Sequence, residues 1–145
     1  VTALYADNCN YIKTFGNTSE SDLNTSFSYE DCNFVEASNN TLRTSSSAGL
    51  GVIKYSVSAS TDCRGLKVCD NLFRGTAAGS VLFRLLVNTS SASFDGLILT
   101  NNIFASPNGI TLNNATKIAD SGGSDYTVTT VVNESNIEVQ EPAAL

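Results

Sequence analysis

A near-repeat between residues 94 and 118 constrains the fold of this chain more than any other feature. The segment Gly96-Leu-Ile-Leu-Thr-Asn101 returns shortly afterwards as Gly109-Ile-Thr-Leu-Asn-Asn114. Each copy joins a glycine, a short apolar run and an amide-rich end, a pattern typical of a β-strand bounded by turns. The two copies therefore predict two neighbouring core strands. Their buried residues should be Leu97, Leu99, Ile110 and Leu112.

Strand patterns dominate the rest of the chain as well. Apolar and polar residues alternate from Val52 to Ala59, which predicts a half-buried strand with Ile53, Tyr55 and Val57 facing inward. About nine to eleven short strands of this kind are recognisable. They predict one all-β domain over residues 1–145, an antiparallel β-sandwich or jelly-roll-like fold. The near-repeat leaves a short parallel β-helix as the alternative, although such solenoids need at least three stacked copies and two are recognisable.

The composition indicates an extracellular protein. Hydrophobic residues make up 41% of the 145 residues, enough for a core, but charged residues make up only 15%. The surface must therefore be built largely from Ser, Thr and Asn, as is common in secreted and cell-surface proteins. The chain begins with Val1 and has no long apolar run, so we expect an exported, processed form that does not insert into a membrane through these residues.

Four cysteines and the absence of histidine favour disulfide bonds over a metal site. The cysteines are Cys9, Cys32, Cys63 and Cys69. Four cysteines allow three pairings. Local closure favours Cys9 with Cys32 and Cys63 with Cys69.

The charge distribution excludes one class of partner. The net charge is −6, and eight scattered Lys and Arg residues form no basic stripe that could neutralise phosphates. Nucleic acid is therefore not an expected partner. Anionic membrane surfaces are disfavoured for the same reason.

Most familiar catalytic chemistry has no residues to support it. Without histidine there is no Ser-His-Asp or Cys-His arrangement, and no nucleotide-binding or zinc-protease motif occurs. We therefore predict no enzymatic activity, no catalytic residue, no metal and no cofactor. The two acidic or amide-rich segments, 7–10 and 120–125, are better explained as turns than as calcium sites. A glycan-active enzyme with two carboxylates remains a minor alternative; its candidates are Glu30, Asp31, Glu36, Asp62, Asp95, Asp120 and Asp125.

Asn-X-Ser/Thr triplets mark possible sites of N-glycosylation in a eukaryotic secretory pathway. In a chain so rich in Ser and Thr, many such triplets arise by chance. They start at Asn17, Asn24, Asn39, Asn88, Asn114 and Asn133.

These observations predict a structural or adhesive subunit that self-assembles, such as part of a pilus, fibre, shell or surface layer. The alternative is a secreted module that binds a surface glycan or receptor. Such a module would use the Ser- and Asn-rich segment 38–51, which we interpret as the longest loop, together with exposed aromatic rings. The candidate rings are Tyr5, Tyr11, Tyr29, Tyr55 and Tyr126.

Overall fold

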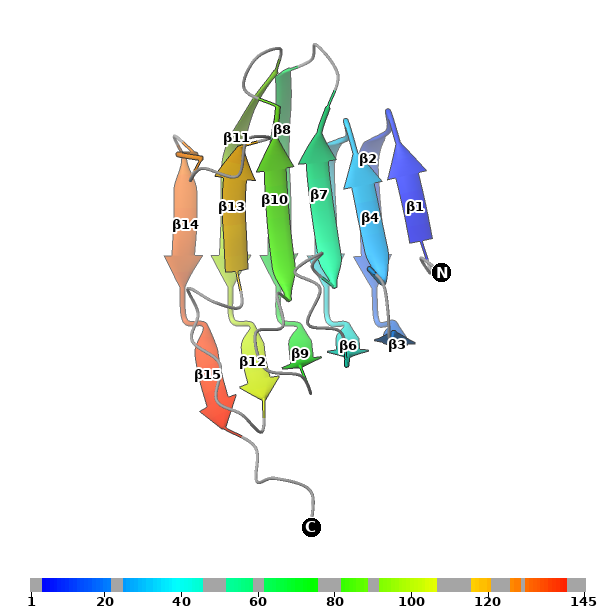
Figure 1. Cartoon of the computed structure of the whole chain (residues 1–145), viewed down its shortest axis with the longest axis vertical. Helices are drawn as coiled ribbons and strands as arrows, with labels where there is room; N and C mark the ends of the chain where they lie inside the picture. The colour runs from blue at the N-terminus through cyan, green and yellow to red at the C-terminus, as the bar shows by residue number, and fades with distance from the viewer. Residues whose placement is uncertain are drawn as a thin grey trace.

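The chain folds into a parallel β-helix, seen in a computed structural model (Figure 1). The structure describes residues 4–21, 25–45, 52–58, 62–75, 82–88, 92–106, 116–120, 126–128 and 130–140. These residues form β1 to β15, and every third strand falls in the same sheet. Each coil of the helix therefore contributes one strand to each of three sheets. In Figure 1 the strands of sheet A lie in front of sheet B, and those of sheet C lie below both.

The three sheets contain five strands each and share one order of coils. Sheet A consists of β1 (Leu4–Asp7), β4 (Phe27–Glu30), β7 (Ile53–Val57), β10 (Phe83–Val87) and β13 (Thr116–Asp120). Sheet B consists of β2 (Asn10–Phe15), β5 (Asn33–Ser38), β8 (Asp62–Cys69), β11 (Ser93–Thr100) and β14 (Val131–Glu134). Sheet C consists of β3 (Thr18–Ser21), β6 (Thr41–Thr44), β9 (Leu72–Gly75), β12 (Ile103–Ser106) and β15 (Ile137–Gln140).

The expected antiparallel sandwich is wrong, and the β-helix alternative describes the fold. Every pairing between the described strands is parallel. Short alternating strands bounded by turns occur in both architectures, so the pattern of single strands could not separate them. The structural repeat is also longer than the near-repeat: Gly65 to Asn71 and Gly96 to Asn102 are equivalent segments of successive coils. The second copy of the near-repeat, 109–114, lies outside the described residues.

Rows of equivalent apolar side chains fill the interior. Val35, Leu66 and Leu97 are register partners in sheet B, and all three are buried. In sheet C the rings of Phe73 and Phe104 stack with their centroids 5.0 Å apart. Burial of such side chains stabilises the fold by roughly 1.5–3 kcal/mol each. The predicted burial of Leu97 and Leu99 is confirmed, whereas Ile110 and Leu112 lie outside the described residues.

The predicted burial of Ile53, Tyr55 and Val57 in β7 is confirmed, but the predicted half-buried alternation is wrong, because Val52 and Ser56 on the other face are buried as well. In-register parallel stacking explains why such rows recur, because each coil presents the same position to the interior at the spacing of neighbouring strands, about 4.8 Å.

Among the described residues, no helix is long and apolar enough to cross a membrane.

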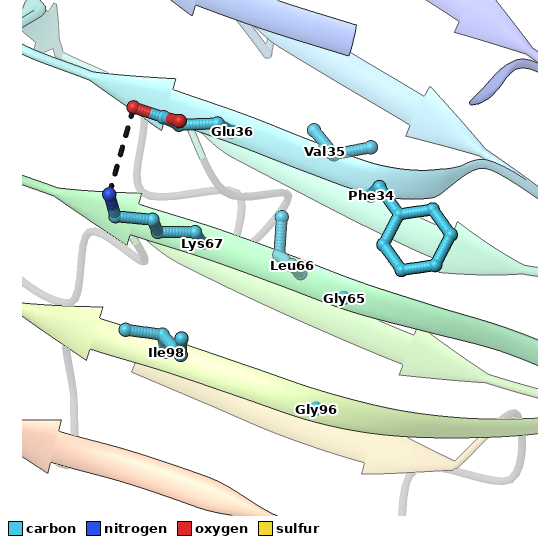
Figure 2. Close-up of a pocket in the computed structure, with 8 residues that line it drawn as sticks. All are labelled: Phe34, Val35, Glu36, Gly65, Leu66, Lys67, Gly96 and Ile98. Atoms are coloured by element: carbon cyan, nitrogen blue, oxygen red, sulfur yellow. Dashed lines mark ion pairs between the residues drawn. The ribbon is translucent and has the colours of Figure 1, made fainter. Parts of the chain in front are cut away.

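One column of sheet B has a left-handed backbone in four successive coils. Tyr11, Phe34, Gly65 and Gly96 have φ values of 58°, 53°, 78° and 81°. A left-handed residue interrupts the pleat of a strand, as in a β-bulge, and bends the strand locally. The first two coils place aromatic rings at this column and the next two place glycines. Figure 2 shows the change from Phe34 to Gly65 and Gly96. The outer face of sheet B therefore changes abruptly from a raised to a recessed surface.

The corner between sheets B and C repeats without change in all five coils. It consists of two residues, the first with a positive φ and the second an asparagine. The asparagines are Asn17, Asn40, Asn71, Asn102 and Asn136. In each pair of coils, Oδ1 of one asparagine accepts hydrogen bonds from the backbone N–H and Nδ2 of the asparagine before it.

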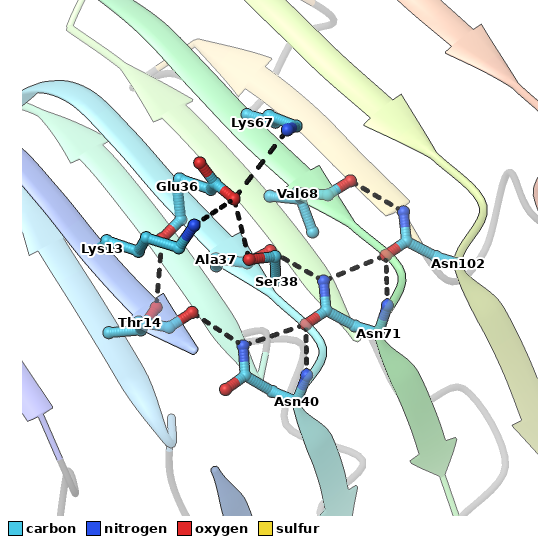
Figure 3. Close-up of polar contacts among 10 residues, drawn as sticks. All are labelled: Lys13, Thr14, Glu36, Ala37, Ser38, Asn40, Lys67, Val68, Asn71 and Asn102. Carbon is cyan, nitrogen blue, oxygen red and sulfur yellow. Dashed lines mark hydrogen bonds and ion pairs between the residues drawn. The ribbon is translucent and has the colours of Figure 1, made fainter. Parts of the chain in front are cut away.

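This asparagine ladder is completed by the backbone of sheet B (Figure 3). The Nδ2 group of Asn71 also donates to the carbonyl of Ala37 in the preceding coil, at 2.9 Å. Asn40, Asn102 and Asn136 make the equivalent bond. Because Asn40, Asn71 and Asn102 are buried, each bond replaces water that the amide has lost, and an unmade bond would cost about 1–3 kcal/mol. The ladder thus fixes the register of the coils at this corner.

Candidate functional site

A hollow on the outer face of sheet B is the candidate site. It has a volume of about 230 Å³ and lies where the aromatic rings of the left-handed column give way to glycines. Side chains of Phe34, Glu36, Lys67 and Ile98 surround it (Figure 2). Its volume is below the roughly 300–1,000 Å³ of pockets that enclose a drug-sized ligand. The hollow therefore suits one ring of a larger ligand that lies along the sheet.

An aromatic wall closes the hollow on the side of the first two coils. The rings of Tyr11 and Phe34 stack with centroids 5.1 Å apart and planes 10° from parallel. Both rings are exposed, with 80% of Tyr11 and 45% of Phe34 accessible to solvent. Large exposed aromatic rings lose apolar contact with water when a ligand covers them, so such a pair is a favourable surface for binding.

Two glycines make the floor. A β-carbon placed on Gly65 would lie 2.9 Å from Cδ1 of Phe34, and one placed on Gly96 would lie 3.3 Å from the backbone nitrogen of Gly65. Any side chain at position 65 would therefore collide with the ring and fill the hollow. The positive φ of both residues favours glycine independently of this close approach.

A row of charged side chains lines the side of the hollow nearer the asparagine ladder. Lys13, Glu36 and Lys67 are register partners in three coils, and the Glu36 carboxylate lies 3.1 Å from Nζ of Lys13 and 3.8 Å from Nζ of Lys67. Ser38 donates to the same carboxylate at 2.9 Å. The hydrogen bond from Ser38, followed by that from Lys13, lowers the pKa of Glu36. Glu36 is therefore ionised at neutral pH and, of its two ammonium partners, holds that of Lys67 beside the hollow.

A second pair of charges lies on the other side of the glycines. Arg64 and Asp95 are exposed register partners that immediately precede Gly65 and Gly96. The Asp95 carboxylate accepts a hydrogen bond from the backbone N–H of Thr130 at 2.7 Å, which is the main reason that its pKa is lowered. The recessed floor thus has hydrogen-bonding groups on both sides.

Three of the five tyrosines predicted as exposed rings are not available for binding. Tyr29 and Tyr55 are fully buried, and Tyr126 is half-buried with its hydroxyl donating to the carbonyl of Phe94. Burial raises the pKa of Tyr29 to about 12. Tyr5 and Tyr11 are exposed, but only Tyr11 belongs to the aromatic wall.

Sequence reasoning missed Phe34, Gly65 and Gly96. The signal that could have found them is the alignment of Asn33-Phe-Val-Glu-Ala-Ser-Asn-Asn40 with Arg64-Gly-Leu-Lys-Val-Cys-Asp-Asn71 and Asp95-Gly-Leu-Ile-Leu-Thr-Asn-Asn102. The aligned asparagines are 31 residues apart. In this alignment Phe34 stands out because its equivalents are glycines.

The predicted loop 38–51 is wrong over part of its length. Ser38 ends β5, and residues 41–44 form β6, in which Leu42 is buried. Residues 46–51 lie outside the described residues. The Ser- and Asn-rich composition misled the interpretation because the asparagine ladder and outward-facing hydroxyls use the same residue types as loops.

The candidate carboxylates do not converge on the aromatic hollow, apart from Glu36. Asp31 and Asp62 line a separate polar hollow of about 280 Å³ together with Asn8 and Asn10. Glu30 accepts hydrogen bonds from Tyr5 and Ser58. Asp125 lies outside the described residues, as does the side chain of Asp120. Within the described part of the chain, no three His, Cys, Asp or Glu side chains are placed to hold a metal ion.

No disulfide bond joins the four cysteines in the structure. Cys63 and Cys69 lie near opposite ends of the extended strand β8. At about 3.3 Å per residue they are roughly 20 Å apart, whereas a disulfide requires α-carbons about 4.4–6.8 Å apart. The predicted pairing of Cys63 with Cys69 is therefore wrong. Cys9 and Cys32, by contrast, lie in equivalent positions of neighbouring coils, because their successors Asn10 and Asn33 are register partners.

The Asn-X-Ser/Thr triplets occupy different environments. Asn39 and Asn133 are exposed, and Asn88 is half-buried. Asn17 is exposed, but its Nδ2 group already donates to the ladder at Asn40. Asn24 and Asn114 lie outside the described residues. Asn39 and Asn133 are therefore the most accessible of the described triplets.

Comparison with protein-family models, with characterised proteins and with solved structures found no match for this chain.

Proposed function

We propose that this protein is a non-enzymatic extracellular adhesive module that binds an extended glycan along the outer face of sheet B. The observation that carries the proposal is the aromatic wall of Tyr11 and Phe34 standing beside the glycine floor of Gly65 and Gly96. A pyranose ring seated on that floor would continue the aromatic stack into the third and fourth coils. Its C–H face would meet the electron-rich face of Phe34.

The polar groups beside the hollow match a sugar better than a purely apolar ligand. Lys67 can only donate hydrogen bonds and ionised Glu36 can only accept them, and a sugar hydroxyl can satisfy either group. A strongly anionic polymer is disfavoured by the net charge of −6. A neutral or weakly charged polysaccharide therefore fits the balance of the site.

The row of side chains across successive coils suits a polysaccharide rather than a single sugar. Lys13, Glu36, Lys67 and Ile98 follow one another in register across four strands of sheet B. Such a row repeats about every 4.8 Å, and a linear polysaccharide could therefore contact one side chain from each successive coil. Contacts of this kind are individually weak and gain strength when several form on one chain.

Binding to an array of immobilised neutral glycans, followed by calorimetry with the retained oligosaccharide, tests this function. Stacking on a ring is worth about 1–3 kcal/mol, so Phe34→Ala should weaken binding by about 5- to 150-fold. Phe15→Ala is the matched control. Like Phe34, Phe15 is an exposed phenylalanine, but it lies on β2 and does not line the hollow. The Phe15→Ala variant should change affinity less than twofold. Equal affinities of wild type and Phe34→Ala would contradict the proposal, as would retention of no glycan.

Self-assembly is a second candidate, and the ends of the asparagine ladder favour it. Among the described residues, nothing donates to Oδ1 of Asn17 at one end, and the backbone N–H of Asn136 has no acceptor at the other. These two groups are complementary, so a second copy could stack end to end and continue the ladder.

Light scattering over a wide concentration range tests end-to-end stacking. The mass of particles should rise with concentration, and Asn17→Ala should reduce this rise. Asn10→Ala is the control, because Asn10 is exposed and its side chain takes no part in the ladder. A protein that stays monomeric at all concentrations would exclude this candidate.

A further inference from the structure

Three cysteines form a column at the corner between sheets A and B. Cys9 precedes Asn10 and Cys32 precedes Asn33, which are register partners in sheet B. The backbone N–H of Arg64 donates to Oδ1 of Asn33 at 3.0 Å, and the register of Val35 with Leu66 places Cys63 opposite Cys32. One cysteine therefore occupies the same position in each of three successive coils.

The thiols of the first two coils have the same orientation. Sγ of Cys9 donates to the carbonyl of Asp7, and Sγ of Cys32 donates to the carbonyl of Glu30, both at 3.1 Å. Asp7 and Glu30 are themselves register partners. Sγ of Cys32 also lies 3.6 Å from the carbonyl oxygen of Ala6, so this thiol lies next to the first coil. Equivalent α-carbons of paired strands are about 4.8 Å apart, within the range of a disulfide.

The third thiol has a different environment. Cys63 is buried, and it is a hydrogen-bonding partner of the Tyr55 hydroxyl, which also donates to the carbonyl of Cys32. The pKa of Tyr55 is raised, chiefly by burial and then by the charge and hydrogen bond of Cys63. Cys9 is exposed and can meet an oxidant from solvent. Cys32 therefore has two neighbours in the column, of which Cys9 is the accessible one.

We propose that Cys9 and Cys32 are a site of oxidative modification, at which a disulfide joins the first coil to the second while Cys63 and Cys69 remain thiols. A low-molecular-weight disulfide can serve as the oxidant. The Cys9 thiolate attacks one sulfur of the reagent, forms a mixed disulfide and releases one thiol. The Cys32 thiolate then attacks Sγ of Cys9 and releases the second thiol. Two protein thiols and one small disulfide thus become one protein disulfide and two small thiols.

The order of the two steps follows from accessibility. Burial is the largest influence on the Cys32 thiol and raises its pKa, so this thiol ionises less readily than an exposed one. The exposed Cys9 should therefore react first, and Cys32 should resolve the mixed disulfide.

The disulfide would restrain the first coil, whose strands lie at the edges of the three sheets. β1, β2 and β3 are edge strands, each paired on one side only among the described strands. Tyr11 and Phe34 each follow the two cysteines by two positions, so the same bond would hold the two rings of the aromatic wall in register. This consequence does not depend on what the aromatic wall binds.

Disulfide mapping of the whole chain tests the proposal. The reduced protein is incubated with oxidised glutathione, its remaining thiols are alkylated, and it is digested with trypsin. Cleavage after Lys13, Arg43, Lys54, Arg64, Lys67 and Arg74 places each cysteine in a different peptide. We expect peptide 1–13 linked to peptide 14–43, with peptides 55–64 and 68–74 alkylated.

Variants and a second measurement separate the alternatives. Cys69→Ser should leave the linkage intact, whereas Cys9→Ser should abolish it and leave Cys32 alkylated. Hydrogen exchange of the wild type should become at least tenfold slower over residues 10–15 after oxidation, because opening of the first coil is restrained. A link between peptides 14–43 and 55–64 would overturn the proposal, as would complete alkylation of all four cysteines after prolonged oxidation.

Discussion

The ring of Phe34 lies so close to Gly65 that a β-carbon on that glycine would stand 2.9 Å from the ring carbon Cδ1. The two residues occupy the same column of neighbouring coils, and both have a positive φ. Because glycine has no β-carbon, the ring can approach the backbone of the next coil this closely. The shape of the hollow therefore depends on a pair of residues 31 positions apart.

Gly65→Ala should destabilise the protein by about 2–3 kcal/mol. A left-handed backbone costs a non-glycine residue about 1–2 kcal/mol, and displacement of Phe34 adds to that cost. Gly16→Ala is the matched control, since Gly16 has a φ of 68° but no atom would lie within 4 Å of its added β-carbon. Gly16→Ala should therefore destabilise the protein only through the cost of a left-handed backbone, about 1 kcal/mol. Urea unfolding measures both, and equal losses would show that the Phe34 contact contributes nothing.

Asn71→Ala should destabilise the protein by about 3 kcal/mol or more. The substitution removes the acceptor of the Asn40 N–H and Nδ2 groups and the donor to Ala37, all of them buried. Asn10→Ala provides the control and should change stability by less than about 0.5 kcal/mol, because it is exposed and outside the ladder. Calorimetric unfolding of both variants checks this, and a small effect at position 71 would mean that neighbouring amides can close the gap.

Replacement of Glu36 should change the acid sensitivity of the protein. The pKa of Glu36 is lower in the folded state, chiefly because of Ser38 and then Lys13. Its stabilisation is therefore present above its unfolded pKa of about 4.3 and is lost as the pH falls through the folded value. Glu36→Gln should cost about 0.2–1 kcal/mol at pH 7, an effect that salt reduces, and nothing below both pKa values. Urea titrations at several pH values measure this, and a constant difference would contradict it.

Tyr29→Phe should make the protein more resistant to alkali. Tyr29 is buried against the Thr14 hydroxyl at 2.6 Å, and its pKa is raised from 10.0 to about 12, first by burial. Because the folded protein resists deprotonation of this group, stability is lost as the pH rises from the unfolded pKa through the folded one. The variant should be about 1 kcal/mol less stable than the wild type at pH 7 through the missing hydrogen bond, but its stability should fall less between pH 10 and 12. Unfolding curves across this range would reveal the difference.

The sequence was sufficient to predict strands but not their partners. The alternation of Ile53, Tyr55 and Val57 and the apolar run around Leu97 follow from local patterns, and their burial agrees with the structure. Parallel or antiparallel pairing depends on residues far apart in the chain. The repeat that determines the pairing varies in length, with neighbouring ladder asparagines 23, 31 or 34 residues apart. A fixed short period therefore could not detect it.

The candidate site was less predictable, because its residues have ordinary local patterns. Phe34 alternates with buried Val35 as any strand residue could, and Gly65 looks like a turn residue in sequence. Their roles appear only when coils are stacked, since a ring in one coil packs closely against the glycine of the next. The prediction that the tyrosines form an exposed binding surface was wrong for Tyr29 and Tyr55. These two are register partners in the core, where their hydroxyls make hydrogen bonds.

The corner that holds the asparagine ladder has the same length in every coil, whereas the other corners do not. Between sheets A and B the connection grows from residues 8–9 in the first coil to 121–130 in the fifth. Variation in length is therefore confined to corners without the ladder. A peptide inserted into the connection between β10 and β11 should leave thermal stability nearly unchanged, while the same insertion between Asn101 and Asn102 should lower it sharply. The molecule can thus serve as a scaffold for grafted loops. Insertions should be tolerated at the two corners without the asparagine ladder and should destabilise the protein at the corner between sheets B and C.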